Sequence, residues 1–301
     1  MNRLTCMARR LRLLVAVLLL ASSVAAQSRV ECSALKSRIL GDAVHYCVML
    51  PPGYDKPDPK RSQRYPVLYF LHGLGDNEQT LFKTGGLTVI DDFREQHKVG
   101  DFLIVTPEAK ASFYVNSANG KVRYSDFFLQ EFIPYVEGKY RVRRVRNARG
   151  ITGISMGGYG ALRFAFAHPE LFSAVSAQSA ALMTESAQEL NAGLHSGTPM
   201  GRLLGPVFGT PINMAHWQES DPLLLAKKNH AAISRMAIYF NCGDRDEYSF
   251  DTGATRLHQE LQSEGIKHEF HLYPGDHSAP YFLSHFAEVL QFHTRVFESG
   301  K

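Results

Sequence analysis

The segment Gly153-Ile154-Ser155-Met156-Gly157-Gly158 decides how the rest of the sequence is interpreted. It follows an apolar run, residues 150–154, that is typical of a buried strand, and it opens an amphipathic stretch, residues 156–168, that is typical of a helix. Glycines two positions before and after the serine permit a tight turn that projects the hydroxyl above the sheet. The helix N-terminus adds backbone N–H groups beside it. The segment therefore predicts a nucleophile elbow with Ser155 as the nucleophile.

Apolar, β-rich runs alternate with amphipathic stretches along most of the chain. Strands are expected at residues 65–71, 102–106, 150–154, 172–177, 236–241 and 268–273, and helices at 79–97, 126–140, 156–168, 252–264 and 280–298. Continuous apolar strands separated by helices predict a mostly parallel sheet with helices on both faces. Residues 30–50 alternate as an antiparallel hairpin does. The expected fold class is α/β, with functional groups at the carboxyl ends of the strands.

A base must accompany the serine, because a serine hydroxyl is a weak nucleophile until its proton is removed. Of the 13 histidines, His277 fits best, since it lies in a loop, residues 273–278, between the last expected strand and the C-terminal helix. His268 and His271 lie on the strand itself, where they are expected to be structural or exposed. His277 is therefore the predicted base.

The carboxylate that orients the base is expected in residues 241–247, which follow the preceding strand. Asp246 is preferred because a carboxylate three positions past Gly243 has room to turn back toward the imidazole. Asp244 is better placed to cap the turn, and Asp251 is a further alternative. The order serine, acid, histidine is the one that a nucleophile elbow of this kind requires.

The segment His72-Gly73-Leu74-Gly75-Asp76 follows the first apolar strand of the expected parallel sheet. This position suits the second half of an oxyanion hole, in which the backbone N–H of Leu74 joins that of Met156 to bind developing negative charge. The useful atom is a backbone N–H, so His72 itself is interpreted as a structural histidine. Leu74 and Met156 are the predicted oxyanion donors.

The N-terminal 26 residues have the pattern of a cleavable secretory signal. Arginines accompany an apolar run from Leu11 to Leu20, and the small residues Ala25 and Ala26 offer a cleavage point. The apolar run is too short to span a bilayer comfortably, and no later segment reaches 18 uninterrupted apolar residues. We expect residues 27–301 to form a single secreted or periplasmic domain without stable membrane insertion.

The charge balance argues against a nucleic-acid partner. Residues 1–26 contain four of the 33 basic residues and none of the 29 acidic ones, so residues 27–301 are formally neutral. Nucleic-acid and polyanion binding normally requires a retained basic excess. The oligomeric state is not indicated by any pattern in the chain.

Three cysteines remain after residue 26, namely Cys32, Cys47 and Cys242. Export would permit a disulfide between the first two, which flank the expected hairpin. A turn at Gly41-Asp42 would, however, place Cys47 opposite Lys36, and this register argues against the bridge. Cys242 ends an apolar strand and is interpreted as a small buried hydrophobe.

Residues 179–234 interrupt the alternation of strands and helices and are rich in Gly, Pro and Met. Long loops in compact domains are usually functional, so this stretch is expected to be a cap inserted over the site. Tyr114, Trp217 and residues 203–208 either line an acyl or aromatic pocket or form the core of the cap, and the second interpretation is favoured.

Taken together, these residues resemble the esterase D family of α/β-hydrolases, which also includes S-formylglutathione hydrolases, feruloyl and acetylxylan esterases and the secreted mycolyltransferases. The resemblance covers nearly the whole chain after residue 26 and rests on residues 46–54, 71–75, 131–137, 153–161 and 275–278. It implies an α/β-hydrolase fold. It also implies the triad Ser155, Asp246 and His277, with Leu74 and Met156 as the oxyanion donors.

The expected function is a secreted serine carboxylic-ester hydrolase that acts through an acyl-enzyme. Its expected substrates are small-molecule or polysaccharide-linked esters, of the feruloyl or acetyl type or with other small acyl groups. The alternatives are acyl transfer to a sugar hydroxyl, an S-formylglutathione-type thioesterase, and a non-catalytic binding protein on the same scaffold. No metal or other cofactor is expected, because the sequence lacks His-Glu-x-x-His, Cys-x-x-Cys and Gly-x-x-x-x-Gly-Lys strings.

Overall fold

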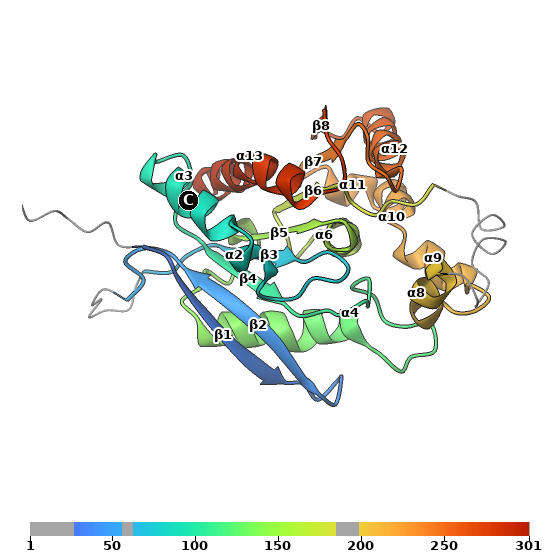
Figure 1. Ribbon diagram of the computed structural model, residues 1–301, viewed down its shortest axis with the longest axis horizontal. Coiled ribbons are helices and arrows are strands. Elements are labelled where there is room, and N and C mark those ends of the chain that lie inside the picture. Colours follow the sequence, from blue (N-terminus) through green and yellow to red (C-terminus); the bar gives the residue numbers. More distant parts are fainter. Residues whose placement is uncertain (1–26, 56–62, 185–198, 301) are drawn as a thin grey trace, which may run out of the picture.

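The computed structural model describes residues 27–55, 63–184 and 199–300 and is built around an eight-stranded sheet (Figure 1). The strands are β1 (Arg29–Lys36), β2 (Ala43–Leu50), β3 (Val67–Leu71), β4 (Leu103–Pro107), β5 (Arg149–Ile154), β6 (Ala174–Gln178), β7 (Ala237–Gly243) and β8 (Glu269–Tyr273). Their order is β1-β2-β4-β3-β5-β6-β7-β8. The pairs β1–β2 and β2–β4 are antiparallel, and the other pairs are parallel. The predicted mostly parallel sheet with an N-terminal hairpin is confirmed.

Helices cover both faces of this sheet. They are α2 (Thr80–Lys83), α3 (Gly86–Glu95), α4 (Tyr124–Phe127), α5 (Ile133–Lys139), α6 (Met156–Ala167), α8 (Pro199–Phe208), α9 (Met214–Ser220), α10 (Pro222–Lys228), α11 (His230–Ile233), α12 (Phe250–Ser263) and α13 (Ala279–Ser299). A π-helical turn, Phe128–Phe132, joins α4 to α5, and a 3₁₀ turn, Arg146–Ala148, precedes β5. In Figure 1, α3 and α13 lie on one side of the sheet and α4 with α5 on the other.

The two faces of the sheet bury separate apolar cores, as the side-chain alternation of a strand requires. On β3, Leu68 and Phe70 pack in one core with Phe286 of α13, whereas Tyr69 packs in the other core with Phe132. Full burial of each such side chain contributes roughly 1.5–3 kcal/mol. The strands are therefore held from both sides, and their carboxyl ends are fixed in position.

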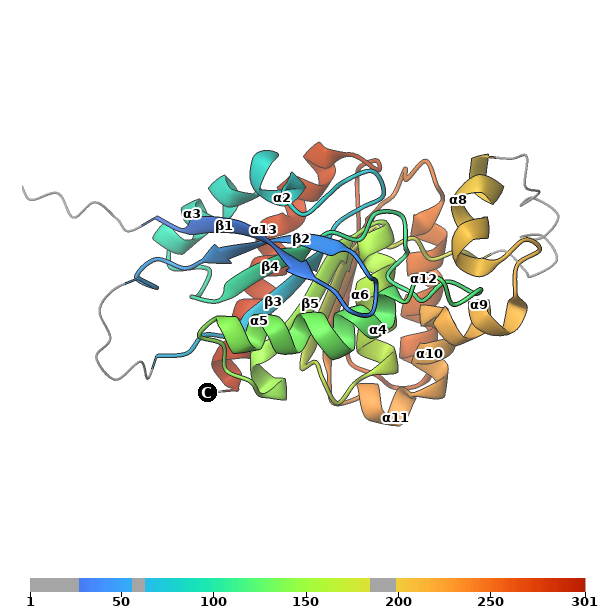
Figure 2. The ribbon, with the colours of Figure 1, turned by 90° about the horizontal axis from the view of Figure 1, so that it is seen from below.

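Residues 79–97 were expected to form one helix but form two, α2 and α3, so the prediction of a continuous helix was wrong. Gly85 lies between them at φ 107°, a conformation that a helix interior excludes and that glycine adopts without strain. The short α2 is consequently free to turn toward α13, next to the segment that follows β3 (Figure 2).

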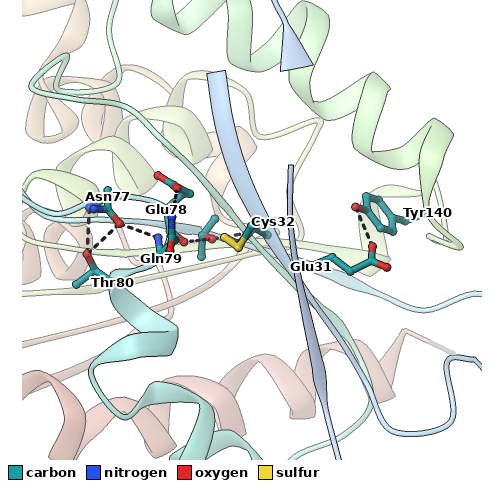
Figure 3. Close-up of a disulfide and its surroundings, with 9 residues drawn as sticks. Glu31, Cys32, Asn77, Glu78, Gln79, Thr80 and Tyr140 are labelled. Atoms are coloured by element: carbon teal, nitrogen blue, oxygen red, sulfur yellow. Dashed lines mark hydrogen bonds between the residues drawn. A yellow bond between two sulfur atoms is a disulfide. The ribbon is translucent and has the colours of Figure 1, made fainter. Parts of the chain in front are cut away.

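The predicted register of the hairpin was also wrong, and with it the argument against the disulfide. Lys36 pairs with Ala43, which places Cys32 directly opposite Cys47, and these two cysteines form a disulfide with a Cα–Cα distance of 4.1 Å (Figure 3). The turn spans residues 37–42, longer than the two-residue turn assumed from Gly41-Asp42.

The Glu131 carboxylate explains the longer turn. It accepts hydrogen bonds from the Ser37 hydroxyl (2.5 Å) and from the backbone N–H groups of Arg38 (3.1 Å) and Ile39 (3.4 Å). A side chain about 90 residues away therefore satisfies the backbone of the loop, which local turn signals cannot reveal.

The connection between β6 and β7 contains α8, α9, α10 and α11, within the stretch predicted as a cap. Figures 1 and 2 show α8 and α9 projecting beyond the sheet on the side of α12. In the described residues, no helix is long and apolar enough to cross a membrane. The predicted signal, residues 1–26, lies outside the described residues.

Candidate active site

Ser155 lies at the sharp turn between β5 and α6. Its backbone has φ 56° and ψ −118°, an unusual conformation for a residue other than glycine, and its side chain remains partly exposed. A Cβ atom on Gly157 would lie 1.9 Å from the carbonyl oxygen of Leu71, and one on Gly153 would lie 2.2 Å from the carbonyl oxygen of Gly157. Both positions therefore require glycine, and the predicted strand–turn–helix context of Ser155 is present.

Backbone hydrogen bonds fix this turn to the neighbouring strand. The Ser155 N–H donates to the Gln178 carbonyl at the end of β6 (2.9 Å), and the Ser155 carbonyl accepts from Ala181 (3.1 Å). Among the described residues, the Ser155 hydroxyl makes no hydrogen bond. The backbone of the elbow is thus held firmly while its hydroxyl stays available.

The predicted oxyanion donors are close to this serine. Gly73, which precedes Leu74, lies against the elbow, since a Cβ on Gly73 would be 3.7 Å from Ser155 Cβ. Within the described part of the chain, the N–H groups of Leu74 and Met156 donate to no protein acceptor. Two free N–H groups therefore flank Ser155, one from the loop after β3 and one from the first residue of α6.

His277 and Asp246 meet at the ends of β8 and β7. The distance between His277 Nδ1 and Asp246 Oδ2 is 2.7 Å, with the Asp246 side chain fully buried and that of His277 10% exposed. Burial raises the pKa of Asp246, but the hydrogen bond and charge of His277 and the N–H groups of Tyr248 and Phe250 outweigh it, so the pKa lies below its ordinary value. Asp246 is therefore an ionised partner that keeps the proton of His277 on Nδ1.

The other two candidate acids lie elsewhere. Asp244 accepts a hydrogen bond from the Gly275 N–H (3.0 Å), in the loop after β8, instead of capping its own turn. Asp251 lies in the first turn of α12. Among the described residues, the carboxylate that contacts the His277 side chain is that of Asp246.

Three aromatic rings surround the His277 imidazole, and no sequence pattern pointed to them. Tyr248, Phe250 and Phe282 meet it edge-on with centroid distances of 5.0, 5.4 and 5.1 Å. The Glu247 carboxylate accepts the backbone N–H of His277 (2.9 Å). The ring and its loop are thus fixed from several sides, while Tyr248 stays 61% exposed and presents an aromatic face beside the site.

Cys242 is buried, as expected, but it also contacts the candidate acid. Its single S–H has two acceptors within reach, Asp246 Oδ2 (3.6 Å) and the Ser179 hydroxyl (3.5 Å). Burial raises the pKa of this thiol to about 12, so it remains a protonated donor. The only sequence signal was the position of Cys242 at the end of β7, four residues before Asp246.

His72 is a structural histidine in the described structure. Its Nδ1–H donates to the Gly73 carbonyl (2.8 Å), and its Nε2 accepts from the Ala109 N–H (3.0 Å). The Tyr114 hydroxyl donates to the His72 carbonyl (2.9 Å). Tyr114 and Trp217 are both buried and, with Leu204, Val207 and Phe208, belong to a packed core, in line with the favoured interpretation.

Across residues 27–55, 63–184 and 199–300, no group of three or more His, Cys, Asp or Glu side chains is arranged to hold a metal ion. The polar groups of the candidate site come from the loops after β3, β5, β7 and β8, all at the carboxyl ends of parallel strands. They consist of a hydroxyl, an imidazole with its carboxylate, and two free backbone N–H groups.

The sheet order, the elbow after β5 and the convergence of side chains at the strand ends define an α/β-hydrolase fold. The chain belongs to the Esterase family, whose model, described as "Putative esterase", matches residues 37–293.

Individual relatives agree with this assignment. An esterase of Mycobacterium tuberculosis is 26% identical over 240 residues, which are 73% of this chain and 51% of the relative. An acetyl esterase of Caldicellulosiruptor saccharolyticus is 25% identical over 247 residues, 80% of this chain and 90% of the relative. A solved ferulic acid esterase superposes with a TM-score of 0.77 at 27% identity and covers 90% of this chain and 99% of its own. The chain spans about half the length of the mycobacterial relative.

Proposed function

We propose that the protein is a secreted serine carboxylic-ester hydrolase that works through an acyl-enzyme. The observation that carries the proposal is the 2.7 Å bond between His277 and Asp246 at the same sheet edge as the strained elbow of Ser155. An ionised, buried carboxylate on Nδ1 leaves Nε2 of the imidazole as the basic atom, which is what a serine nucleophile needs.

In the proposed reaction, Ser155 Oγ attacks the ester carbonyl while His277 Nε2 takes the hydroxyl proton. The negative charge that develops on the carbonyl oxygen is bound by the N–H groups of Leu74 and Met156. The imidazolium, stabilised by Asp246, then gives its proton to the leaving alcohol, and the acyl group remains on Ser155. Water, activated in turn by His277, hydrolyses this acyl-enzyme and restores the serine.

The absence of a hydrogen bond from the Ser155 hydroxyl to the described residues is compatible with this role. Catalytic hydrogen bonds are often long or poorly aligned before the substrate binds and tighten in the productive complex. The backbone around the serine, by contrast, is already fixed by Gln178 and Ala181. The main chain, which supplies the oxyanion donors, is therefore the rigid part of the proposed site.

The proposed substrates are feruloyl-type, acetyl-type or other small acyl esters, including those linked to polysaccharides. The acetyl esterase and the ferulic acid esterase among the relatives support this class. The exposed ring of Tyr248 beside His277 also supports it, because aromatic faces bind the apolar faces of rings. The proposed export of the protein, which rests on residues 1–26, would bring it into contact with such esters.

The test compares hydrolysis of p-nitrophenyl acetate and methyl ferulate by residues 27–301 with hydrolysis by the Ser155→Ala variant. Loss of a triad nucleophile costs on the order of 10⁶-fold in turnover. A Ser234→Ala variant, which removes an exposed hydroxyl, serves as the control and is expected to keep wild-type rates.

Equal activity of the wild type and Ser155→Ala would show that Ser155 is not the nucleophile. If both are inert and a fluorophosphonate probe fails to label Ser155, the non-catalytic scaffold is the better description. Adding a sugar acceptor to the assay separates hydrolysis from acyl transfer, since a transferase yields an acylated sugar in competition with water.

A further inference from the structure

A cavity of about 250 Å³ lies between α2 and the first turns of α13. Its apolar walls are formed by Phe70, Leu81, Ile154, Phe282, Leu283 and Phe286. Figures 1 and 2 show that α2 and α13 lie on the same side of the sheet, away from α4 and α5. The cavity is thus separate from the packed core that contains Tyr114 and Trp217.

The cavity adjoins the residues of the proposed active site on two sides. Gly73 and Ile154 line it, and both border Ser155: Ile154 precedes it in the chain, and a Cβ on Gly73 would be 3.7 Å from Ser155 Cβ. On the opposite wall, the Phe282 ring also contacts His277 edge-on at 5.1 Å. The cavity therefore lies directly beside the residues that position Ser155 and His277.

The walls of the cavity are firmly positioned. The Phe282 carbonyl accepts a hydrogen bond from the Gln178 side chain at the end of β6 (3.1 Å), which fixes the first turn of α13 against the sheet. Phe286 is almost fully buried and packs edge-on against Phe70 at 5.9 Å. Leu283 is only partly buried, and its Cδ1 lies 3.6 Å from the position of a Cβ on Gly85, just beyond α2.

The size and lining of the cavity indicate what it can hold. Pockets for drug-sized ligands measure roughly 300–1,000 Å³, so a cavity of about 250 Å³ suits one group of a substrate. The apolar side chains in the lining favour an apolar group. The polar side chains in the lining are His72 and Asp76, from the loop after β3, and Thr80 and Thr84, at α2.

We propose that this cavity binds the apolar group of the ester substrate and that Leu283 limits the length of that group. The proposal rests on the proposed esterase function and narrows its substrate class to esters with one short apolar chain or a single ring in the cavity. Either the acyl or the alcohol part of the ester has this chemistry, and the two are distinguished by experiment.

The experiment measures kcat/KM for two series of esters. In the first, p-nitrophenyl acetate, butanoate, hexanoate and octanoate vary the acyl group; in the second, ethyl, butyl and hexyl acetate vary the alcohol. Leu283→Trp fills the cavity and is expected to lower the hexanoate-to-acetate ratio, or the hexyl-to-ethyl ratio, at least tenfold. The series that responds identifies the part of the ester that the cavity holds.

Two further variants make the result decisive. Leu283→Ala enlarges the cavity and is expected to shift the preferred chain to a longer one, the opposite direction. Leu224→Trp introduces the same ring at an exposed position on α10 and should leave both ratios at wild-type values. Thermal unfolding of each variant checks that it is folded.

Unchanged chain-length ratios in both Leu283 variants, with hydrolysis retained, would overturn the role of the cavity and leave the esterase proposal intact. Absence of hydrolysis of every ester by the wild type, together with no labelling of Ser155, would instead overturn the esterase proposal and the cavity assignment with it.

Discussion

In the described residues, a serine and a histidine can be compared at two places, at the edge of the sheet and inside it. In the core, His293 Nε2 lies 2.9 Å from Ser176 Oγ, and both residues are fully buried between the sheet and α13. At the edge, Ser155 and His277 are partly exposed, and no hydrogen bond joins them among the described residues. By proximity alone, the core pair would be the better candidate.

The positions of the imidazole protons, however, favour His277 over His293 as the base. The Ser176 hydroxyl donates to Thr152 Oγ1 (2.7 Å), so the core imidazole donates to Ser176 through Nε2–H, and no group in the described part of the chain pairs with its Nδ1. It cannot accept a proton from the serine. At the edge, the bond to Asp246 holds the proton on Nδ1 and leaves Nε2 basic. The group that fixes the imidazole tautomer therefore decides whether a histidine can act as the base, and its distance from a serine does not.

Replacing the Asp246 carboxylate, which fixes the tautomer of His277, is the strongest test of the difference between the two places. Asp246→Asn is expected to lower kcat by about 10⁴-fold, because the amide favours the wrong imidazole tautomer. Steady-state hydrolysis of p-nitrophenyl acetate measures the effect. Asp244→Asn is the matched control, since it keeps an oxygen acceptor for Gly275 and should change the rate little. A large loss in Asp244→Asn together with a small one in Asp246→Asn would reverse the assignment of the acid.

His293 in the core is expected to make the free energy of unfolding depend on pH. Burial lowers the pKa of His293 to about 3, against 6.5 in an unfolded chain. Between these values the unfolded state binds a proton that the folded state does not, so the free energy of unfolding falls as the pH decreases from 6.5, by up to about 1.4 kcal/mol per pH unit.

The non-titrating variant His293→Gln should therefore lose less stability between pH 6.5 and pH 4 than the wild type. Urea unfolding at several pH values measures this difference. Parallel pH profiles for the two proteins would show that His293 does not titrate as its burial predicts.

The smallest effect on catalysis is expected from the core serine. Ser176→Ala leaves Thr152 and His293 without a partner, which costs roughly 1–3 kcal/mol of stability. Its rate of ester hydrolysis should stay close to that of the wild type, and a fluorophosphonate probe should label Ser155 in both proteins. Labelling of Ser176, detected by mass spectrometry of peptides, would contradict the distinction between the two pairs.

Patterns that depend on neighbouring residues were predictable from the sequence. The elbow around Ser155 and the strands of the parallel sheet follow from local glycine positions and apolar runs, and they are present as expected. The meeting of Asp246 with His277 followed from one rule, that the ends of adjacent parallel strands share an edge.

Features that depend on distant partners were not predictable. The hairpin register was missed because Glu131 stabilises its turn from another part of the chain. The rings around His277 come from two segments about 30 residues apart, around the start of α12 and in the first turn of α13, so no single stretch of sequence indicates them. The proton arrangement at His293 likewise depends on Ser176, more than 100 residues earlier.

The cross-strand disulfide has a consequence for association between chains. β1 is an edge strand, paired on one side only, and an unpaired edge can recruit another strand. The covalent link from Cys32 to Cys47 keeps β1 in register on β2, which hinders its exchange into a second molecule. Production in a reducing compartment would remove this restraint, so the β1 edge of the sheet is protected in this way only where the protein can be oxidised.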